Sequence, residues 1–257
     1  MNTDRNRAEY ISLISAAVGT LVIGCVGIVF WVISDSQAIL LDGFFNLTYF
    51  VTGLFTLKVA NLVQSGDDER FPFGYGYFEA LVNGIKGLLV LGVSIMALVG
   101  AIDALLSGGR PISAGAAVVY GVFATIACWL MAIMTHRGAK RSSSPLVKAD
   151  AENWLVNGAI STAVLFAFLG IIFIQGTSFE FAAPYVDPVL VILVVLISIS
   201  VPVRMAWYAL MELLNRAPSK ETVQQVTQVV SSATKELPVK KLFVRVIQPG
   251  RTRMVLV

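Results

Sequence analysis

Two groups of oxygen-bearing side chains stand inside long apolar stretches of this sequence. The first is Asp42 with Asn46, and the second is Asp150 with Asn153 and Asn157. Spacings of three and four residues place the members of each group on one face of a helix. A charged side chain at the centre of a bilayer costs about 3 kcal/mol or more, so such residues usually mark an ion pathway. The five residues therefore predict a metal site.

The chemistry of these side chains favours a hard divalent cation. Carboxylate and amide oxygens suit Mn²⁺ or Fe²⁺ better than Zn²⁺, which prefers histidine and cysteine. Glu152 points away from the Asp150 face, and His136 is interpreted as a solvated loop residue that ends a helix. The alternative interpretation of the asparagines is structural, as hydrogen-bonding groups that join neighbouring helices.

Composition identifies the elements that must position these groups. Of the 257 residues, 56% are hydrophobic and 14% are charged, and the mean hydropathy is +0.78. These values exclude a disordered chain, a nucleic-acid-binding module and an ordinary cytosolic enzyme. No nucleophile–base pair or phosphate-binding loop indicates an enzyme, and both cysteines lie in apolar runs, where no disulfide is implied. We predict an all-α bundle of six membrane-spanning helices, over residues 11–33, 37–62, 77–106, 113–134, 144–174 and 187–214.

Six crossings put both termini on one side of the membrane. The excess of Lys and Arg near the termini and after the fourth helix predicts that this side is the cytoplasm. The opposite loops carry Asp35, Arg110, Glu180 and Asp187. At 1.5 Å per residue, residues 42–46 lie roughly 8–14 Å below the outer boundary, and 153–157 roughly 13–20 Å above the inner one. In a hydrocarbon core of about 30 Å, the two groups are expected to meet near the middle.

The pattern changes after Pro218. Residues 1–217 are predicted to form the transport domain, and 218–257 a partial cytoplasmic C-terminal domain of α+β type. There we predict a helix over 221–235, strands over 241–248 and 252–257, and a turn at Pro249-Gly250. A helix and one hairpin bury little core, and the chain ends on apolar residues. We therefore expect the natural domain to continue and this chain to be shortened.

Several segments resemble the cation diffusion facilitator family. They occur in that family's order and spacing across nearly the whole chain. The Asp-Pro at 187–188 resembles the pair that starts the family's sixth helix. The other resembling segments are Ser36-Gln-Ala-Ile-Leu-Leu-Asp-Gly43, Phe73-Gly-Tyr-Gly-Tyr-Phe-Glu-Ala80, Ala149-Asp-Ala-Glu-Asn153 with Asn157, and Leu213–Pro218.

The resemblance implies a homodimeric exporter that moves a divalent metal in exchange for protons. The metal is the transported substrate, no cofactor is implied, and the site lies between the second and fifth helices. Such a protein would reside in a bilayer, here a bacterial inner membrane, with no nucleic-acid partner.

This chain departs from the family pattern at the predicted site. Asn46 replaces the usual second-helix Asp, and Asn153 and Asn157 replace the usual fifth-helix His and Asp. Two alternatives stay open: a transport-silent member that acts as a sensor or partner subunit, and an exporter of another solute.

Overall fold

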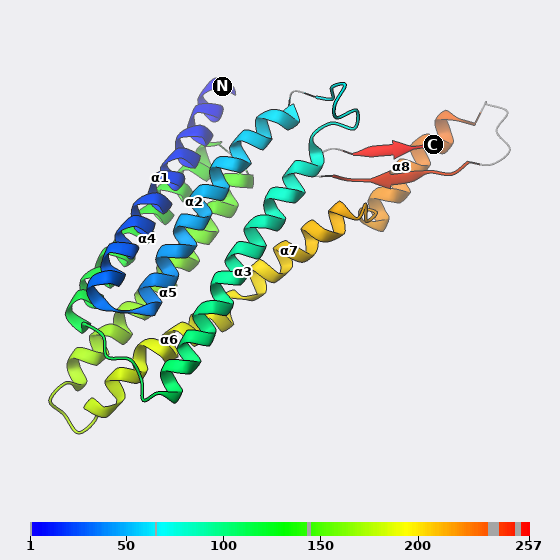
Figure 1. Ribbon diagram of the computed structural model, residues 1–257. Coiled ribbons are helices and arrows are strands. Elements are labelled where there is room, and N and C mark those ends of the chain that lie inside the picture. The colour runs from blue at the N-terminus through cyan, green and yellow to red at the C-terminus, as the bar shows by residue number, and fades with distance from the viewer. Residues whose placement is uncertain (1, 65, 143–144, 236–241, 250–252) are drawn as a thin grey trace. The chain divides into compact units, whose positions relative to one another are not determined.

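The computed structural model describes residues 2–64, 66–142, 145–235, 242–249 and 253–257 (Figure 1). Six helical stretches among these residues are long and apolar enough to cross a membrane, which confirms the predicted six-helix architecture. The elements are α1 (Asn2–Ser34), α2 (Gln37–Gln64), α3 (Gly76–Leu106), α4 (Ala114–Ser142), α5 (Pro145–Ile174), the 3-10 helix η1 (Glu180–Ala182), α6 (Ala183–Ser198), α7 (Ser200–Leu213), α8 (Lys220–Ala233), β1 (Arg245–Ile247) and β2 (Met254–Leu256).

Helix α4 is longer than the sequence predicts. It continues to Ser142, so His136 is an exposed helical residue and its assignment to a loop was wrong. The reason is tertiary packing at Gly138. A Cβ atom at this glycine would collide with the side chain of Ser12 on α1, which shows that the two helices still touch at this level. Helix α4 therefore continues past His136, where it still packs against α1.

The sixth crossing is two helices rather than one. Pro202 has no backbone N–H, so the carbonyl of Ser198 loses its helical partner and the regular helix is interrupted at Ile199. Next to this break, the Ser198 hydroxyl donates to the Val194 carbonyl at 2.7 Å. The crossing also begins at Ala183, before the predicted residue 187, because Pro184 suits the first turn of a helix.

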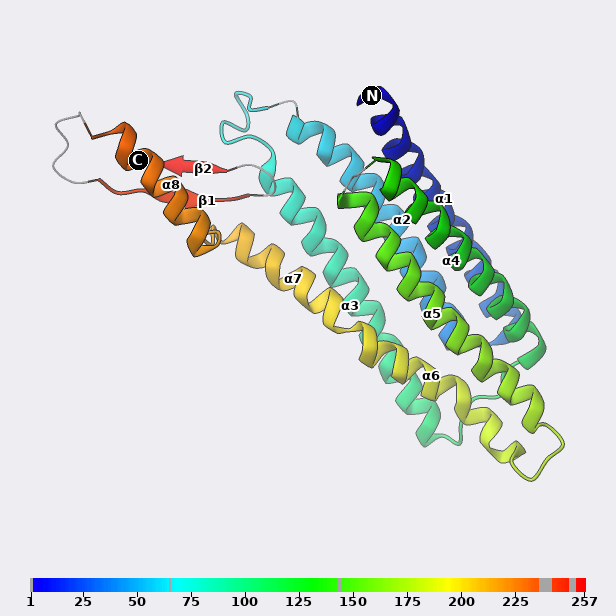
Figure 2. The ribbon, with the colours of Figure 1, turned by 180° about the vertical axis from the view of Figure 1, so that it is seen from behind.

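The chain divides into two compact units. The first contains residues up to Gly53 and Leu89–Ser200. In it α4 packs along both α1 and α5, which run beside it in both views (Figures 1 and 2). Small side chains allow this close packing, since Gly121 on α4 lies directly against Leu165 on α5.

We call the end of the first unit at which α2 and α4 begin the outer end, following the predicted orientation. An apolar cluster gathers side chains from α2 to α6 there, and we call it the outer core. Its buried members are Ala38, Ile39, Leu41, Ala101, Ala114, Ala117, Tyr120, Ala124, Phe168, Ile171, Val191 and Val195.

The second unit contains Leu54–Leu88 and the chain from Val201 onward. Helix α3 packs closely on α7, because Gly87 contacts the backbone of Pro202 and Ala206. Strands β1 and β2 pair antiparallel, with Val246 opposite Val255. Both strands are shorter than predicted, and part of the predicted hairpin, including Gly250, lies outside the described residues. The predicted domain boundary after residue 217 falls within this unit.

The acidic loop before α3 is folded rather than open. The Asp68 carboxylate accepts hydrogen bonds from the Tyr75 hydroxyl and from the backbone N–H groups of Arg70 and Phe71. The Tyr75 hydroxyl, with these N–H groups, holds the pKa of Asp68 below its usual value. At the next turn Tyr77 donates a hydrogen bond to Asn215, which ties α3 to the segment after α7.

A substitution at Gly109, between α3 and α4, tests the packing of the outer end. The φ of Gly109 is +90°, and a Cβ there would lie 2.7 Å from the Cβ of Pro184. We expect Gly109→Ala to cost about 1–3 kcal/mol through backbone strain and this clash. Gly115→Ala is the control, because a Cβ at Gly115 meets nothing within 4 Å. Thermal unfolding of the purified variants in detergent measures the difference, and equal melting temperatures would contradict the packing described.

Candidate metal centre

Asp42 and Asn46 form a connected pair on α2. The Asn46 amide nitrogen donates to Asp42 Oδ1 at 3.1 Å and to the Asp42 carbonyl at 2.9 Å. Asn46 is buried and Asp42 is half-buried. This contact confirms that the spacing of four residues brings both side chains to one face of the helix.

Tyr120 on α4 is a partner that the sequence reasoning missed. Its hydroxyl donates to Asp42 Oδ2 at 2.5 Å, so each carboxylate oxygen of Asp42 accepts one hydrogen bond from a side chain. A signal was present, because a buried tyrosine hydroxyl in an apolar run usually has a hydrogen-bond partner. The sequence could not identify that partner, since 78 residues separate the two side chains.

The surroundings of this pair are tightly packed. Helices α1 and α2 approach so closely at Gly27 that a Cβ there would lie 2.9 Å from the Gly43 Cα and 3.0 Å from the Tyr120 hydroxyl. The Tyr120 ring lies 5.8 Å from the ring of Phe30 and 6.4 Å from that of Phe123. Asp42 thus lies where α1, α2 and α4 meet.

The second predicted group lies on α5. A stripe of Val147, Ala151, Trp154 and Gly158 is buried, whereas Asn153 and Asn157 lie outside this stripe and are exposed. Asp150 is half-buried and Glu152 is exposed. Polar groups within a membrane span face water or another protein surface rather than lipid. The face of α5 that carries Asn153 and Asn157 is therefore suited to line a water-filled route for a cation.

Contacts between α4 and α5 show the relative depth of the two groups. Leu165 lies at Gly121, beside Tyr120, and Ser161 Oγ lies 3.8 Å from Cys128 Sγ. Asp42, which accepts from the Tyr120 hydroxyl, therefore lies nearer the level of Leu165 than that of Asn157, which is eight residues or roughly 12 Å away along the helix. The sequence-based depths placed the two groups level, whereas these contacts place Asp42 nearer the outer end than Asn157. Among the described residues, no hydrogen bond joins Asn153 or Asn157 to Asp42, and a single ion shared by both groups stays a prediction.

The described residues contain no group of three or more His, Cys, Asp or Glu side chains that could hold a metal. In the predicted site, Asn46, Asn153 and Asn157 would supply amide oxygens, and Asp42 and Asp150 would supply the carboxylates.

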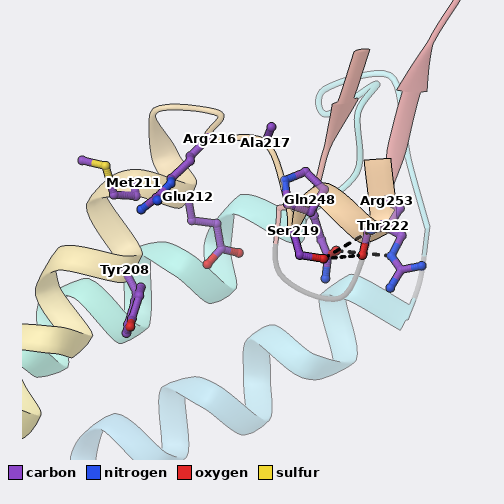
Figure 3. Close-up of a pocket in the computed structure, with 10 residues that line it drawn as sticks. Tyr208, Met211, Glu212, Arg216, Ala217, Ser219, Thr222, Gln248 and Arg253 are labelled. Carbon is purple, nitrogen blue, oxygen red and sulfur yellow. Dashed lines mark hydrogen bonds between the residues drawn. The ribbon is translucent and has the colours of Figure 1, made fainter. Parts of the chain in front are cut away.

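A separate hollow of about 630 Å³ lies in the second unit (Figure 3). Its polar side chains largely satisfy one another, as Ser219 and Thr222 share a hydrogen bond and Arg253 donates to Gln248. The side chains of Arg216 and Arg253 point in different directions, and the Glu212 carboxylate lies between them (Figure 3). The hollow therefore lacks converging groups of one charge and is not a candidate metal centre.

Asp187 has a structural role that the sequence did not show. It was predicted to lie in an outer loop at the start of the sixth helix, and this was wrong: it is fully buried within α6. Its carboxylate accepts hydrogen bonds from the Ser36 hydroxyl and from the N–H groups of Gln37 and Ala38. These are the free donors at the start of α2, where negative charge is stabilised. Asp187 therefore fixes α2 five residues before Asp42.

Removing this carboxylate should destabilise the first unit. Asp187→Ala leaves the Ser36 hydroxyl and two buried N–H groups without their acceptor, at a cost of about 2 kcal/mol or more. Asp103→Ala is the matched control, because Asp103 is exposed near the outer end of α3. Thermal unfolding in detergent should show a lower melting temperature for Asp187→Ala only. Equal melting temperatures would show that the cap contributes nothing measurable.

Comparison with known proteins agrees with this architecture. The cation efflux transmembrane domain matches residues 13–214, which is most of the chain. The manganese efflux system protein MneP of Bacillus subtilis (strain 168) is 25% identical over 108 residues, which are 42% of this chain and 36% of that protein. The chain thus matches little more than a third of this relative's length. The family match, carried by a domain of six membrane-spanning helices, shows that this integral membrane protein belongs to the cation efflux family of metal transporters.

Proposed function

We propose that this protein exports a hard divalent cation, Mn²⁺ or Fe²⁺ rather than Zn²⁺, in exchange for protons. The observation that carries the proposal is the Asp42 carboxylate, which lies inside a membrane-spanning helix and accepts hydrogen bonds from Asn46 and Tyr120. A carboxylate at such a depth is costly and needs a function.

The donor set supports the choice of metal. Asp42, Asn46, Asp150, Asn153 and Asn157 offer only oxygen ligands, and oxygen sites favour Mn²⁺ over softer metals. MneP, the relative matched above, is a manganese efflux system protein, which agrees with this choice.

The arrangement of the first unit supports entry from the inner side. Leu41, immediately before Asp42, is buried in the outer core with Phe168, so apolar side chains lie between Asp42 and the outer end. Toward the inner end, Asn153 and Asn157 are exposed on α5. A cation would therefore meet these asparagines first and then reach Asp42, and the 12 Å offset (roughly eight residues along the helix) is then a path.

Electrostatics supports proton exchange. A carboxylate in a low-dielectric interior needs a compensating charge, which either a proton or a metal ion can supply. Binding of one excludes the other at the same oxygen. Alternate exposure of Asp42 to the two sides would then exchange metal for protons.

Orientation and assembly follow from surface properties. The exposed basic residues His136, Arg137, Lys140 and Arg141 near the end of α4 support placement of that end, and of both termini, in the cytoplasm. We place the protein in a bacterial inner membrane as a homodimer, with lipid and a second copy covering its exposed apolar faces.

The first test of this function is Asp42→Asn. The variant removes the charge but keeps an oxygen that can accept from Tyr120, so the fold should persist. We expect Mn²⁺ uptake into proteoliposomes under a proton gradient to fall by at least about tenfold, the loss of one charge-assisted ligand. Asp103→Asn is the control, and a panel of Fe²⁺, Co²⁺, Zn²⁺ and Cd²⁺ tests selectivity. Undiminished transport by a folded Asp42→Asn protein would overturn the site, and a preference for Zn²⁺ would overturn the choice of metal.

A second test measures proton release. Titrating Mn²⁺ into weakly buffered protein with a pH indicator should release about one to two protons, one for each carboxylate that titrates. Metal affinity should fall as the pH falls, because protons then compete for the same oxygens. Asp150→Asn should reduce the proton count, whereas Glu152→Gln, a nearby variant with the same charge change, should not. Metal binding without proton release would rule out the exchange mechanism.

A further inference from the structure

Both oxygens of the Asp42 carboxylate accept a hydrogen bond in the described structure. Oδ1 accepts from the Asn46 amide at 3.1 Å, and Oδ2 accepts from the Tyr120 hydroxyl at 2.5 Å. Asn46 turns its amide nitrogen toward the carboxylate and also donates to the Asp42 carbonyl. The two α2 residues of the proposed site thus direct their polar atoms at each other and at Tyr120.

Tyr120 is held in place by packing. Its side chain is only 3% exposed, and its ring lies beside Phe30 and Phe123. Its hydroxyl lies against Gly27, where a Cβ atom would come within 3.0 Å of it. The hydroxyl therefore has one position in this packing, and it cannot follow Asp42 if that side chain turns toward an ion.

A hydrogen bond and a metal bond compete at the same oxygen. The Tyr120 proton occupies the side of Oδ2 that a cation would need, and a divalent cation close to that O–H group would repel the proton. A hydrogen bond to a charged group is worth about 1.5–3 kcal/mol. A metal ion that binds Oδ2 on the side of this O–H group displaces the Tyr120 hydroxyl and loses this stabilisation.

We infer that Tyr120 is a positioning residue that competes with the transported cation for Asp42 and so promotes its release. When the carboxylate returns to the Tyr120 hydroxyl, it gives up the metal, and the metal-free protein is stabilised. This inference rests on the proposed role of Asp42 as the charged ligand, and it adds a residue on α4 to a site predicted on α2 and α5 alone.

The test is Tyr120→Phe, which keeps the ring and removes the hydroxyl. We expect Mn²⁺ to bind about tenfold more tightly or better by calorimetry, because metal binding no longer breaks a hydrogen bond to a charged group. In proteoliposomes KM should fall and the maximal rate should also fall, because release is slower. Tyr208→Phe is the matched control: Tyr208 is 63% exposed on α7, and its variant should change neither quantity.

Thermal unfolding gives a readout that does not depend on transport. Without metal, Tyr120→Phe should melt at a lower temperature than the unaltered protein, and saturating Mn²⁺ should raise its melting temperature by a larger increment. A variant that is destabilised but shows the same metal-induced increment would indicate a packing role only and would overturn the inference.

Asp42→Asn separates the two proposals. If this variant binds Mn²⁺ as tightly as the unaltered protein, Asp42 is not the charged ligand and the proposed site fails together with the role of Tyr120. If Asp42→Asn loses binding while Tyr120→Phe weakens binding or leaves it unchanged, the site stands and the competition is wrong. Loss of binding in the first variant with tighter binding in the second supports both.

Discussion

A carboxylate inside a membrane domain must find its hydrogen-bond donors within the protein, and this requirement organises the first unit. Asp42 and Asp187 each meet it with donors from another helix. Asp187 on α6 uses the start of α2, and Asp42 on α2 uses α4. The cost of leaving such a group unsatisfied is several times that of losing a neutral hydrogen bond, so the contacts fix α2 against two neighbouring helices.

Glycines make this arrangement possible. The Tyr120 hydroxyl reaches Asp42 only because α1 carries Gly27 where it crosses Gly43 of α2. A larger residue at Gly27 would push the two helices apart or fill the space that the hydroxyl occupies. The same α1–α2 contact that brings the backbones together therefore also determines how Asp42 is held.

The sequence predicted the helices well because apolar length alone identifies a membrane span, and the relation of Asp42 to Asn46 follows from helical periodicity. It failed where distant segments decide the outcome. His136 was assigned to a loop because the charged residues after it resemble one, whereas contact with Ser12 keeps the chain helical. Asp187 was counted with the charged residues of the outer loops, whereas it is buried in α6 against the start of α2. Neither its burial nor the Tyr120 contact can be derived from local spacing.

The offset between the two polar groups has a consequence for transport. Two ligand pairs at one depth would form a single deep site from which a doubly charged ion escapes slowly. In the proposed mechanism Asp42 and Asn157, roughly 12 Å apart along α5, would instead bind the ion in steps, each with fewer ligands. In the proposed mechanism the amide ligands at the exposed inner position are weak, and the Tyr120 hydroxyl can rebind the Asp42 carboxylate that follows them. Both features would lower the barrier between entry and release. The replacement of charged ligands by asparagine is then compatible with transport, because an exporter needs reversible capture more than tight binding.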